Sequence, residues 1–187
     1  MKNNKFIKYF LIFSILILSS CGFQIIYKDQ TTQDSIAHQL ASIRIKKNRN
    51  QLDVMLKSNL YDIFNPDNIK AEPRYFLEFT TKKNLNLIVT TPSGATGRNK
   101  VNLTVNYVLR NLENGLEISS GTDSVYDSYD ITENRYGTFT AEEFVIKNLT
   151  KVISQNIRNS LINDIINASQ ECEKNKNNTY FRCLIIN

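Results

Sequence analysis

The chain has 187 residues and a formal net charge of +5 at pH 7. Three of its cations, Lys2, Lys5 and Lys8, lie in residues 1–20, which contain no acid, so the remaining 167 residues carry only +2. This small excess does not predict a nucleic-acid partner, which requires a clustered basic face. The remaining length is enough for one domain with a proper hydrophobic core.

The first 20 residues follow the plan of a secretory signal peptide, with a positive start, a short apolar run and small residues before a cleavage site. The apolar run at 9–18 is about half the length that a membrane-spanning helix needs. Leu18-Ser19-Ser20-Cys21 resembles the lipobox of bacterial lipoproteins. We therefore expect residues 1–20 to be a lipoprotein signal peptide. The alternative is an ordinary signal peptide with a coincidental cysteine.

Cleavage at this point would make Cys21 the first residue of the mature chain, with lipid on both its sulfur and its amine. Each buried methylene contributes about 0.8 kcal/mol, so one chain binds reversibly while three chains anchor the protein permanently. Gly22, rather than an aspartate, follows the cysteine, and by the sorting habit of such lipoproteins this favours the outer membrane. We expect a protein that is lipid-anchored at the periplasmic face of that membrane.

Residues 21–39 are polar and show no periodicity, and we expect them to form a tether between the lipid and the domain. A short half-buried strand is predicted at 41–47, because Ile43 and Ile45 alternate there with cations. The domain is therefore expected to begin close to residue 40.

An amphipathic helix is predicted at 50–64, with Asn50 as its cap and Pro66 ending it. Its apolar residues recur at three- and four-residue spacing, so they would form one face. That face consists of Leu52, Met55, Leu56, Leu60 and Ile63.

Three further segments have the composition of strands: 73–84, 86–91 and 99–111. The last is the clearest, because its alternate residues are apolar and would share one side of a sheet. These residues are Val101, Leu103, Val105, Tyr107 and Leu109. Asn114-Gly115 then predicts a two-residue hairpin turn in which both positions have positive φ. The returning strand is expected at about 116–129.

A second helix is predicted to begin near Thr140, which forms a capping box with Glu143 and is flanked by a hydrophobic staple of Phe139 and Phe144. Glu142 and Glu143 also suit the positive end of the helix dipole. A stripe of apolar residues follows at helical spacing, and such a stripe is typical of core packing. It consists of Val145, Leu149, Val152, Ile153, Ile157, Leu161 and Ile165.

The order strand, helix, several antiparallel strands, helix predicts an α+β domain, with a mostly antiparallel or mixed sheet of about four strands and two helices packed on one face. This domain is expected at 40–167, followed by a polar tail at 168–187. Cys172 and Cys183 in the tail are expected to form a disulfide in an oxidising compartment, worth about 3 kcal/mol on the chain-entropy model. A metal site is the alternative, but two sulfurs without a nearby histidine coordinate poorly.

The sequence lacks the motifs of catalysis. His38 lies in the expected tether, away from any serine or cysteine motif, and "SGATGRNK" has neither P-loop nor Rossmann spacing. Asp123 and Asp127 would lie about 13 Å apart on an extended strand. With Asp130 we interpret them as a solvated face rather than a calcium site. We therefore expect a binding protein with no catalytic residue, metal or cofactor, and not an enzyme.

Two groups of cations remain as candidate binding residues. The first group is Arg44, Lys46, Lys47 and Arg49, and the second is Arg98 with Lys100 beside the expected hairpin tip. Solvated surface charge is the simplest interpretation. The functional alternative is contact with phosphate or acidic groups of an amphiphile, or with an acidic partner surface.

Several stretches follow one another in the order of a known family: the lipobox with "CGFQIIY", the "IRI" strand, an amphipathic helix, "RYFLEFT", "VNLTVNYVLRN", a glycine hairpin and "SGTDSVYDSYDITENRYGTFTAEEFVIKNLTKVISQNI". Together they resemble the lipopolysaccharide-assembly lipoprotein LptE family, in its alphaproteobacterial style, over roughly residues 18–165. The most specific parts are Cys21-Gly22-Phe23-Gln24 with Tyr27, and the stretch from Ser128-Tyr129 into the last helix. That helix has Thr, Asn and Ile where relatives carry alanines, and the cysteine-bearing tail lies outside the pattern.

The resemblance implies a protein that plugs the lumen of the outer-membrane barrel LptD and helps to deliver lipopolysaccharide to the outer leaflet. It also places Arg98 and Lys100 in the loop expected to reach lipopolysaccharide phosphates. A lipoprotein accessory of a phospholipid or solute transport system is the alternative. A periplasmic hydrolase is a third, which the missing nucleophile–base pair disfavours.

Overall fold

The computed structural model describes residues 30–46, 50–89 and 97–174. The chain divides into two compact units, Met1–Asp34 and Ser35–Asn187. The second unit contains the sheet and the packed helices, and it positions every candidate residue considered below.

Several sequence predictions fall on parts of the chain that are not described. These are the signal peptide at 1–20, the lipid-bearing Cys21, the hairpin tip at 90–96 and the tail beyond residue 174 with Cys183. The side chain of Cys172 is not described either. The predicted acylation and the predicted disulfide therefore stay predictions.

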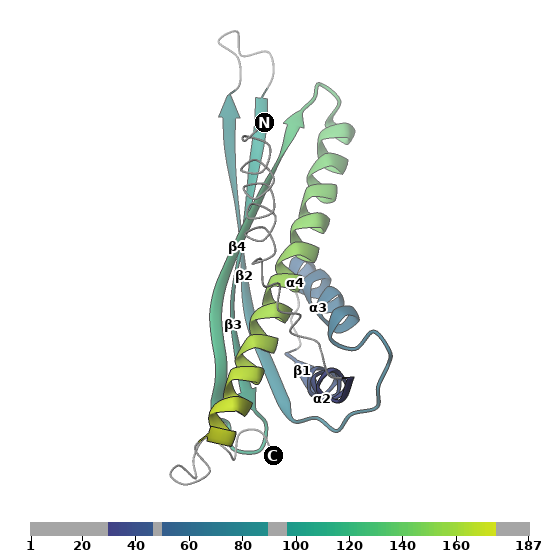
Figure 1. Cartoon of the computed structure of the whole chain (residues 1–187). Helices are drawn as coiled ribbons and strands as arrows, with labels where there is room; N and C mark the ends of the chain where they lie inside the picture. The colour runs from purple at the N-terminus through teal and green to yellow at the C-terminus, as the bar shows by residue number, and fades with distance from the viewer. Residues whose placement is uncertain (1–29, 47–49, 90–96, 175–187) are drawn as a thin grey trace, which may run out of the picture. The chain divides into compact units, whose positions relative to one another are not determined.

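The sheet has four strands in the order β1-β2-β3-β4 (Figure 1). The short strand β1 (Ile43–Ile45) runs parallel to β2 (Tyr75–Val89). The strand β3 (Gly97–Asn111) pairs antiparallel with β2, and β4 (Glu117–Ile131) pairs antiparallel with β3. The expectation of a mixed sheet of four strands is therefore confirmed.

The two segments predicted at 73–84 and 86–91 form one strand. Asn84 lies opposite Asn102 and Leu85 lies opposite Val101, so the register with β3 continues without a break. The alternation of side chains between the two faces of the sheet therefore continues through the polar residue Asn84. β2 is therefore as long as β3 and β4, at 15 residues each.

The helix α3 (Gln51–Phe64) confirms the helix predicted at 50–64. The Asn50 side chain accepts a hydrogen bond from Leu52 N at 3.3 Å, which is the capping contact expected of an asparagine. The helix ends at Asn65, immediately before Pro66.

The last helix, α4 (Arg135–Lys174), begins five residues before the predicted cap at Thr140. Asn134 takes the capping role, because its Oδ1 accepts from Tyr136 N at 3.0 Å. The Thr140 hydroxyl lies inside the helix and donates to backbone carbonyls of the preceding turn. Phe139 and Phe144 are both exposed, so the predicted capping box and staple are wrong.

The expected tether is helical at its end, since α2 spans Gln30–Ala41. Ile36 and Leu40 of this helix are buried in the core, four residues apart, whereas His38 is exposed. The sequence did not indicate this helix, because Ile36 and Leu40 are surrounded mostly by polar residues and form only one pair at helical spacing. The domain therefore has three described helices rather than the two predicted.

The turn between β3 and β4 is longer than the predicted two-residue hairpin. Only Gly115 of the predicted pair has positive φ, at 69°. The Asn111 side chain accepts from Glu113 N at 2.7 Å, and Asn111 O accepts from Gly115 N at 2.9 Å. The register then shifts so that Arg110 lies opposite Glu117. These contacts of Asn111 stabilise a wider loop, so the two-residue prediction is wrong.

The core lies between one face of the sheet and the helices (Figure 1). The predicted apolar side of β3 is buried throughout, and the α4 stripe is buried except for Val152. Among the described helices, which include the 40 residues of α4, none is both long and apolar enough to cross a membrane. The largest fully buried side chains are Phe64, Ile43, Leu56, Leu60, Leu77, Leu103, Leu109, Ile153, Ile157 and Leu161.

Candidate functional site

The sheet has one face against the core and one open face. Successive side chains of a strand point to opposite faces, and the odd-numbered residues of β2 and β3 face the core. Their even-numbered neighbours form the open face, where amides and hydroxyls predominate and lie exposed or half-buried. The central part of this face consists of Thr80, Lys82, Asn84, Asn102, Thr104, Asn106, Thr122, Ser124 and Tyr126.

Side chains on the open face form hydrogen bonds across the strands. Thr122 Oγ1 donates to Asn106 Oδ1 at 2.6 Å, and Ser124 Oγ donates to Asn102 Oδ1 at 2.9 Å. The hydroxyls of Thr104 and Ser124 lie 3.1 Å apart. Such cross-strand pairs order the side chains and leave further donors and acceptors for a partner. The open face therefore suits a polar partner surface.

Arg98 and Lys100, the residues predicted to contact lipopolysaccharide, lie two residues apart on this same face of β3. Arg98 Nε donates to Asp130 Oδ1 at 2.7 Å, and this hydrogen bond lowers the pKa of Asp130 and raises the pKa of Arg98. Lys100 Nζ lies 3.8 Å from the centroid of the Tyr126 ring. Each cation thus has a partner within the sheet, with which an external phosphate must compete.

The other basic group is divided among different roles. The Arg44 guanidinium donates to Ala41 O at 3.2 Å and to Ala71 O at 3.1 Å, so it ties β1 to neighbouring backbone. Lys46 Nζ lies 2.8 Å from Glu78 Oε1. Lys47 and Arg49 lie outside the described residues. In the described part of this group, both cations therefore have internal partners.

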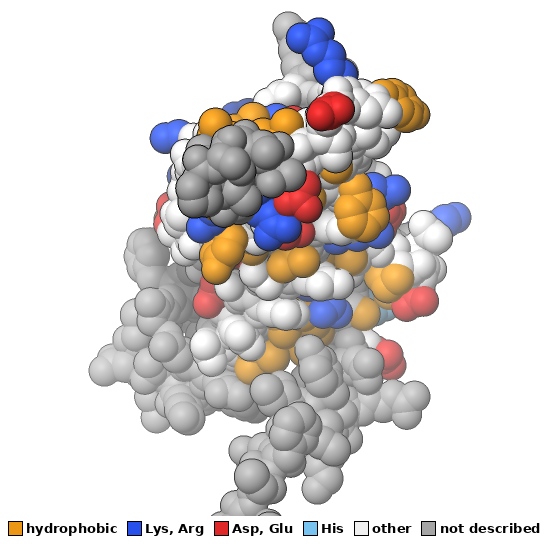
Figure 2. Space-filling view, turned by 90° about the horizontal axis from the view of Figure 1, so that it is seen from above, with side chains coloured by type: hydrophobic (Ala, Val, Ile, Leu, Met, Phe, Trp, Pro, Cys, Tyr) orange, Lys and Arg blue, Asp and Glu red, His pale blue; other side chains and the backbone are white. Residues whose placement is uncertain are grey.

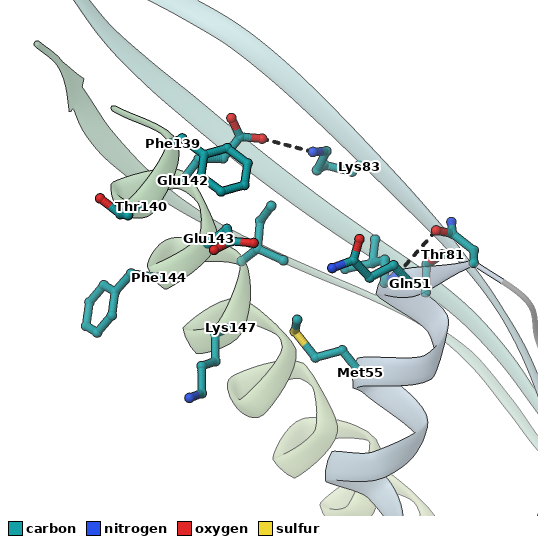
Figure 3. A pocket seen from close by; sticks show the side chains of 13 residues that line it. Gln51, Met55, Thr81, Lys83, Phe139, Thr140, Glu142, Glu143, Phe144 and Lys147 are labelled. Carbon is teal, nitrogen blue, oxygen red and sulfur yellow. Dashed lines mark hydrogen bonds and ion pairs between the residues drawn. The ribbon is translucent and has the colours of Figure 1, made fainter. Parts of the chain in front are cut away.

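A groove of about 760 Å³ lies between α3, β2 and the amino-terminal turns of α4 (Figure 3). Its apolar lining comes mainly from Leu52, Met55 and Ile146, and Phe139 lies at its rim beside Glu142. Thr81 Oγ1 donates to Asp53 Oδ1 at 2.5 Å, which fixes the start of α3 to β2. The groove was not foreseen, because its walls come from three segments far apart in the sequence.

A polar network connects both walls of this groove. Lys83 Nζ lies 3.0 Å from Glu142 Oε1, and Tyr129 Oη donates to Glu142 Oε2 at 2.9 Å. Asn99 Nδ2 in turn donates to Tyr129 Oη at 3.0 Å. Burial alone raises the pKa of Glu142, but the hydrogen bonds from Lys83 and Tyr129 outweigh it and hold that pKa below its ordinary value. Glu142 thus joins α4 to the sheet. Its predicted role at the helix dipole, with Glu143, is wrong, because α4 begins at Arg135 and has no acidic residue in its first turn.

The three aspartates of β4 do not share a face. In the register with β3, Asp123 and Asp127 lie opposite Val105 and Val101 on the core side, while Asp130 is on the open face. Asp127 and Asp130 are exposed, as predicted, but they lie on opposite faces, and Asp123 is half-buried, so the prediction of a single solvated face is wrong. Within the described ranges, no group of three or more His, Cys, Asp or Glu residues could hold a metal ion.

Two groups stand out among the large exposed apolar side chains, which also occur on α3, on β4 and in the turn between β3 and β4. On α4 they are Tyr136, Phe139 and Phe144, and on β2 they are Leu85, Leu87 and Ile88. Viewed from above, the hydrophobic side chains form separate patches with charged side chains between them (Figure 2). Among the residues that the structure describes, no single continuous apolar surface is visible from that side.

Comparisons with known proteins identify the fold. No protein-family model matches the chain, and no curated protein matches its sequence. The crystal structure of a predicted lipoprotein from Caulobacter crescentus matches with a TM-score of 0.57 and 17% identity, covering 68% of this chain and 93% of that chain. Rare lipoprotein B from Shewanella oneidensis matches with a TM-score of 0.52 and 13% identity, covering 68% and 96%. At these identities the likeness shows the fold alone, which this chain shares with two structures named as lipoproteins.

Proposed function

We propose that this chain is an outer-membrane lipoprotein of the LptE type, which binds inside the LptD barrel and assists delivery of lipopolysaccharide to the outer leaflet. One combined observation carries the proposal. A lipobox-like sequence ending at Cys21 precedes a domain whose fold occurs in structures named as lipoproteins. The proposed activity is binding, in which no covalent bond is made or broken.

The open face of the sheet is the proposed contact with the barrel. The interior of a large outer-membrane barrel is polar, so a domain seated there needs a polar surface. Side chains such as Asn102, Thr104 and Ser124 meet this need, because a hydrogen-bonding wall replaces the water that they give up. An apolar face would instead favour a partner with an apolar contact surface.

Arg98 and Lys100 are the proposed lipopolysaccharide contacts. They lie on the open face at the hairpin end of β3, where a phosphate can approach from outside the sheet. A guanidinium and an ammonium together suit a phosphorylated headgroup, the first as a fork of donors and the second as a point charge. The Arg98–Asp130 pair is exposed, so exchanging the carboxylate for a phosphate has a low energetic cost.

The test is to identify what co-purifies with the chain. A carboxy-terminally tagged chain is expressed in its own organism, extracted in mild detergent and analysed by mass spectrometry, with an unrelated tagged outer-membrane lipoprotein as the control. We expect LptD in roughly equal amount, together with lipopolysaccharide, and neither with the control. Recovery of periplasmic transporter subunits in place of the barrel would instead support a phospholipid or solute transport accessory.

A further inference from the structure

β2 is paired along only part of one side. β1 covers its first three residues, Tyr75–Leu77, and Lys46 N adds a hydrogen bond to Leu77 O at 3.0 Å. Over residues 83–89, β2 pairs with β3 on one side and with no described residue on the other. This segment, called the β2 edge below, lies at the outer border of the sheet (Figure 1).

The backbone groups of the β2 edge point in a known direction. Leu77 O faces the β1 side, where it accepts from Lys46 N. Successive residues of a strand present their N–H and C=O groups to alternate sides, so the odd-numbered residues continue to face that side. Lys83, Leu85 and Leu87 therefore each present one N–H and one C=O group away from β3.

The side chains of this edge are unusually apolar for an exposed strand. Leu85, Leu87 and Ile88 are 47%, 64% and 41% exposed. Exposed apolar side chains beside unpaired backbone groups make a template for another strand, and proteins normally protect such edges. The β2 edge has this template over half of a 15-residue strand.

The opposite edge of the sheet shows the usual protection. On β4, Asp123 lies on the core side opposite Val105 with its Oδ2 buried, and a charge that points inward opposes strand addition. α4 also packs along β4, with its contacts to the sheet mainly on that strand. The two edges therefore differ in kind, because within the described residues the β2 edge has no comparable protection.

We propose that the β2 edge binds an extended segment of a partner protein by strand addition. The segment has apolar side chains at alternate positions and an acidic residue placed to meet Lys82. Lys82 is exposed on the open face and has no ion-pair partner among the described residues, whereas Lys83 contacts Glu142. Main-chain hydrogen bonds supply affinity in this mode of recognition, and the alternate side chains supply specificity.

Alternate side chains of the added strand meet two different environments. One set lies on the core side beside Leu85 and Leu87, in line with Lys83 and Thr81 at the lining of the groove. Apolar residues are favoured there, because they cover leucine side chains that are otherwise exposed to water. The other set lies in line with the polar open face, where hydroxyl or acidic residues fit.

A second copy of this chain suits the β2 edge poorly. Antiparallel pairing of two β2 edges across a twofold axis would place Lys83 of each copy opposite Val89 of the other, and the segment 83–89 contains no acidic residue that could meet Lys82. Pairing of β2 with β4 of another copy would be head-to-tail and would give an open chain of molecules. The partner is therefore a different polypeptide, and this inference stands apart from the barrel proposal.

The test uses a fluorescein-labelled nine-residue peptide of alternating valine and threonine, with one glutamate near an end, and the full chain in mild detergent. We expect saturable binding by fluorescence anisotropy, weakened severalfold when lysine replaces glutamate. Two further peptides are N-methylated at odd or at even positions. Strand addition predicts that one pattern abolishes binding and the other does not. Absence of binding by the parent peptide, or equal binding of both methylated peptides, would overturn the proposal.

Two variants of the protein separate backbone pairing from side-chain contact. Leu87→Pro removes an N–H group that points away from β3, at the unpaired border of the sheet. It leaves the hydrogen bonds to β3 intact, because those come from even-numbered residues. Leu87→Ala keeps the N–H group and loses only the side chain. We expect the proline variant to bind the peptide about tenfold more weakly than the alanine variant, as for loss of a hydrogen bond and blocked pairing. Equal binding by the two folded variants would contradict strand addition.

Hydrogen exchange on the unmodified chain gives a test that does not depend on the folding of a variant. The amides of Lys83, Leu85 and Leu87 should exchange rapidly in the free chain and slow at least tenfold on peptide addition. Protection of these amides without peptide, at a concentration where sedimentation shows a monomer, would mean that the chain covers its own edge. Concentration-dependent protection with dimer formation would identify a second copy. Either result would overturn the proposal.

Discussion

Glu142→Gln tests the contacts that hold the amino-terminal turns of α4 against the sheet. The Glu142 carboxylate accepts hydrogen bonds from Lys83 of β2 and Tyr129 of β4, at 3.0 and 2.9 Å. Glutamine keeps the shape of the side chain but removes the charge, so the ion pair is lost and the tyrosine hydrogen bond is weakened. Glu143→Gln is the matched control, since its side chain is an exposed neighbour on the same turn.

The magnitude follows from the exposure of the three groups. A hydrogen bond to a charged group contributes about 1.5–3 kcal/mol when buried, whereas an exposed ion pair contributes about 0–1 kcal/mol. The Lys83 and Glu142 side chains are 35% and 26% exposed, so their ion pair should contribute about as little as an exposed pair. Tyr129 is buried, so its hydrogen bond to the carboxylate should contribute more. We expect Glu142→Gln to lower the free energy of unfolding by about 1–2 kcal/mol at pH 7, and Glu143→Gln by less than about 0.5 kcal/mol.

The effect should depend on pH in a defined direction. The pKa of Glu142 is below its ordinary value in the folded chain, although burial opposes this, because Lys83 and Tyr129 stabilise the carboxylate. The unfolded chain therefore binds this proton more readily, and the stabilisation is complete above the unfolded pKa of about 4.3. It is lost as the pH falls through the lower folded pKa.

Urea unfolding followed by circular dichroism, at pH 7 and at intervals down to pH 3, measures this difference. The difference in free energy of unfolding between wild type and Glu142→Gln should become smaller below the unfolded pKa. The small difference between wild type and Glu143→Gln should stay constant. A gap at pH 7 no larger than that of the control would refute the stabilising role of the network. A gap that widens on acidification would refute the direction of the pKa shift.

Three further outcomes are expected. Gly121→Ala should lower the free energy of unfolding in urea by about 1–3 kcal/mol, because overpacking strains a filled core; the new Cβ would lie 2.6 Å from Oη of the buried Tyr107. Cys21→Ser should abolish incorporation of labelled palmitate, and an unlabelled wild-type chain would refute acylation. Arg98→Ala with Lys100→Ala should weaken lipopolysaccharide binding by the purified chain about tenfold in surface plasmon resonance, as expected for two lost charge contacts. Unchanged binding would refute the loop assignment.

Elements with strong periodicity could be predicted from the sequence. The alternation along β3 identified all five of its core-facing residues between Val101 and Leu109, because a period of two matches the pleat. The 14 residues of α3 were equally clear, since Asn50 and Pro66 mark its ends. In both cases the information is local, so neighbouring residues suffice to read it.

Features that depend on competition or on distant residues could not be read in this way. The pattern Thr140 to Glu143 satisfies the rule for a helix start, but Asn134 offers a cap six residues earlier and the helix begins there. Of the candidate site, the sequence identified Arg98 and Lys100 but gave no sign of their internal partners. The contact of Lys83 with Glu142 joins residues 59 positions apart, and no local pattern encodes it.

The lengths of the elements explain why the proposed binding features gather at one end of the sheet. Strands of 15 residues extend about 50 Å, whereas the 14 residues of α3 cover about 21 Å. The long helix α4 packs mainly on β4, so it does not cover the part of β2 that extends beyond α3. The hairpin end of β2 and β3 is therefore left with Leu85 and Leu87 exposed on one face and Arg98 on the other. Shortening β2 and β3 together by four residue pairs at this end would remove Leu87, Arg98 and Lys100 and stop before the buried Val101, so it should weaken both proposed contacts at once.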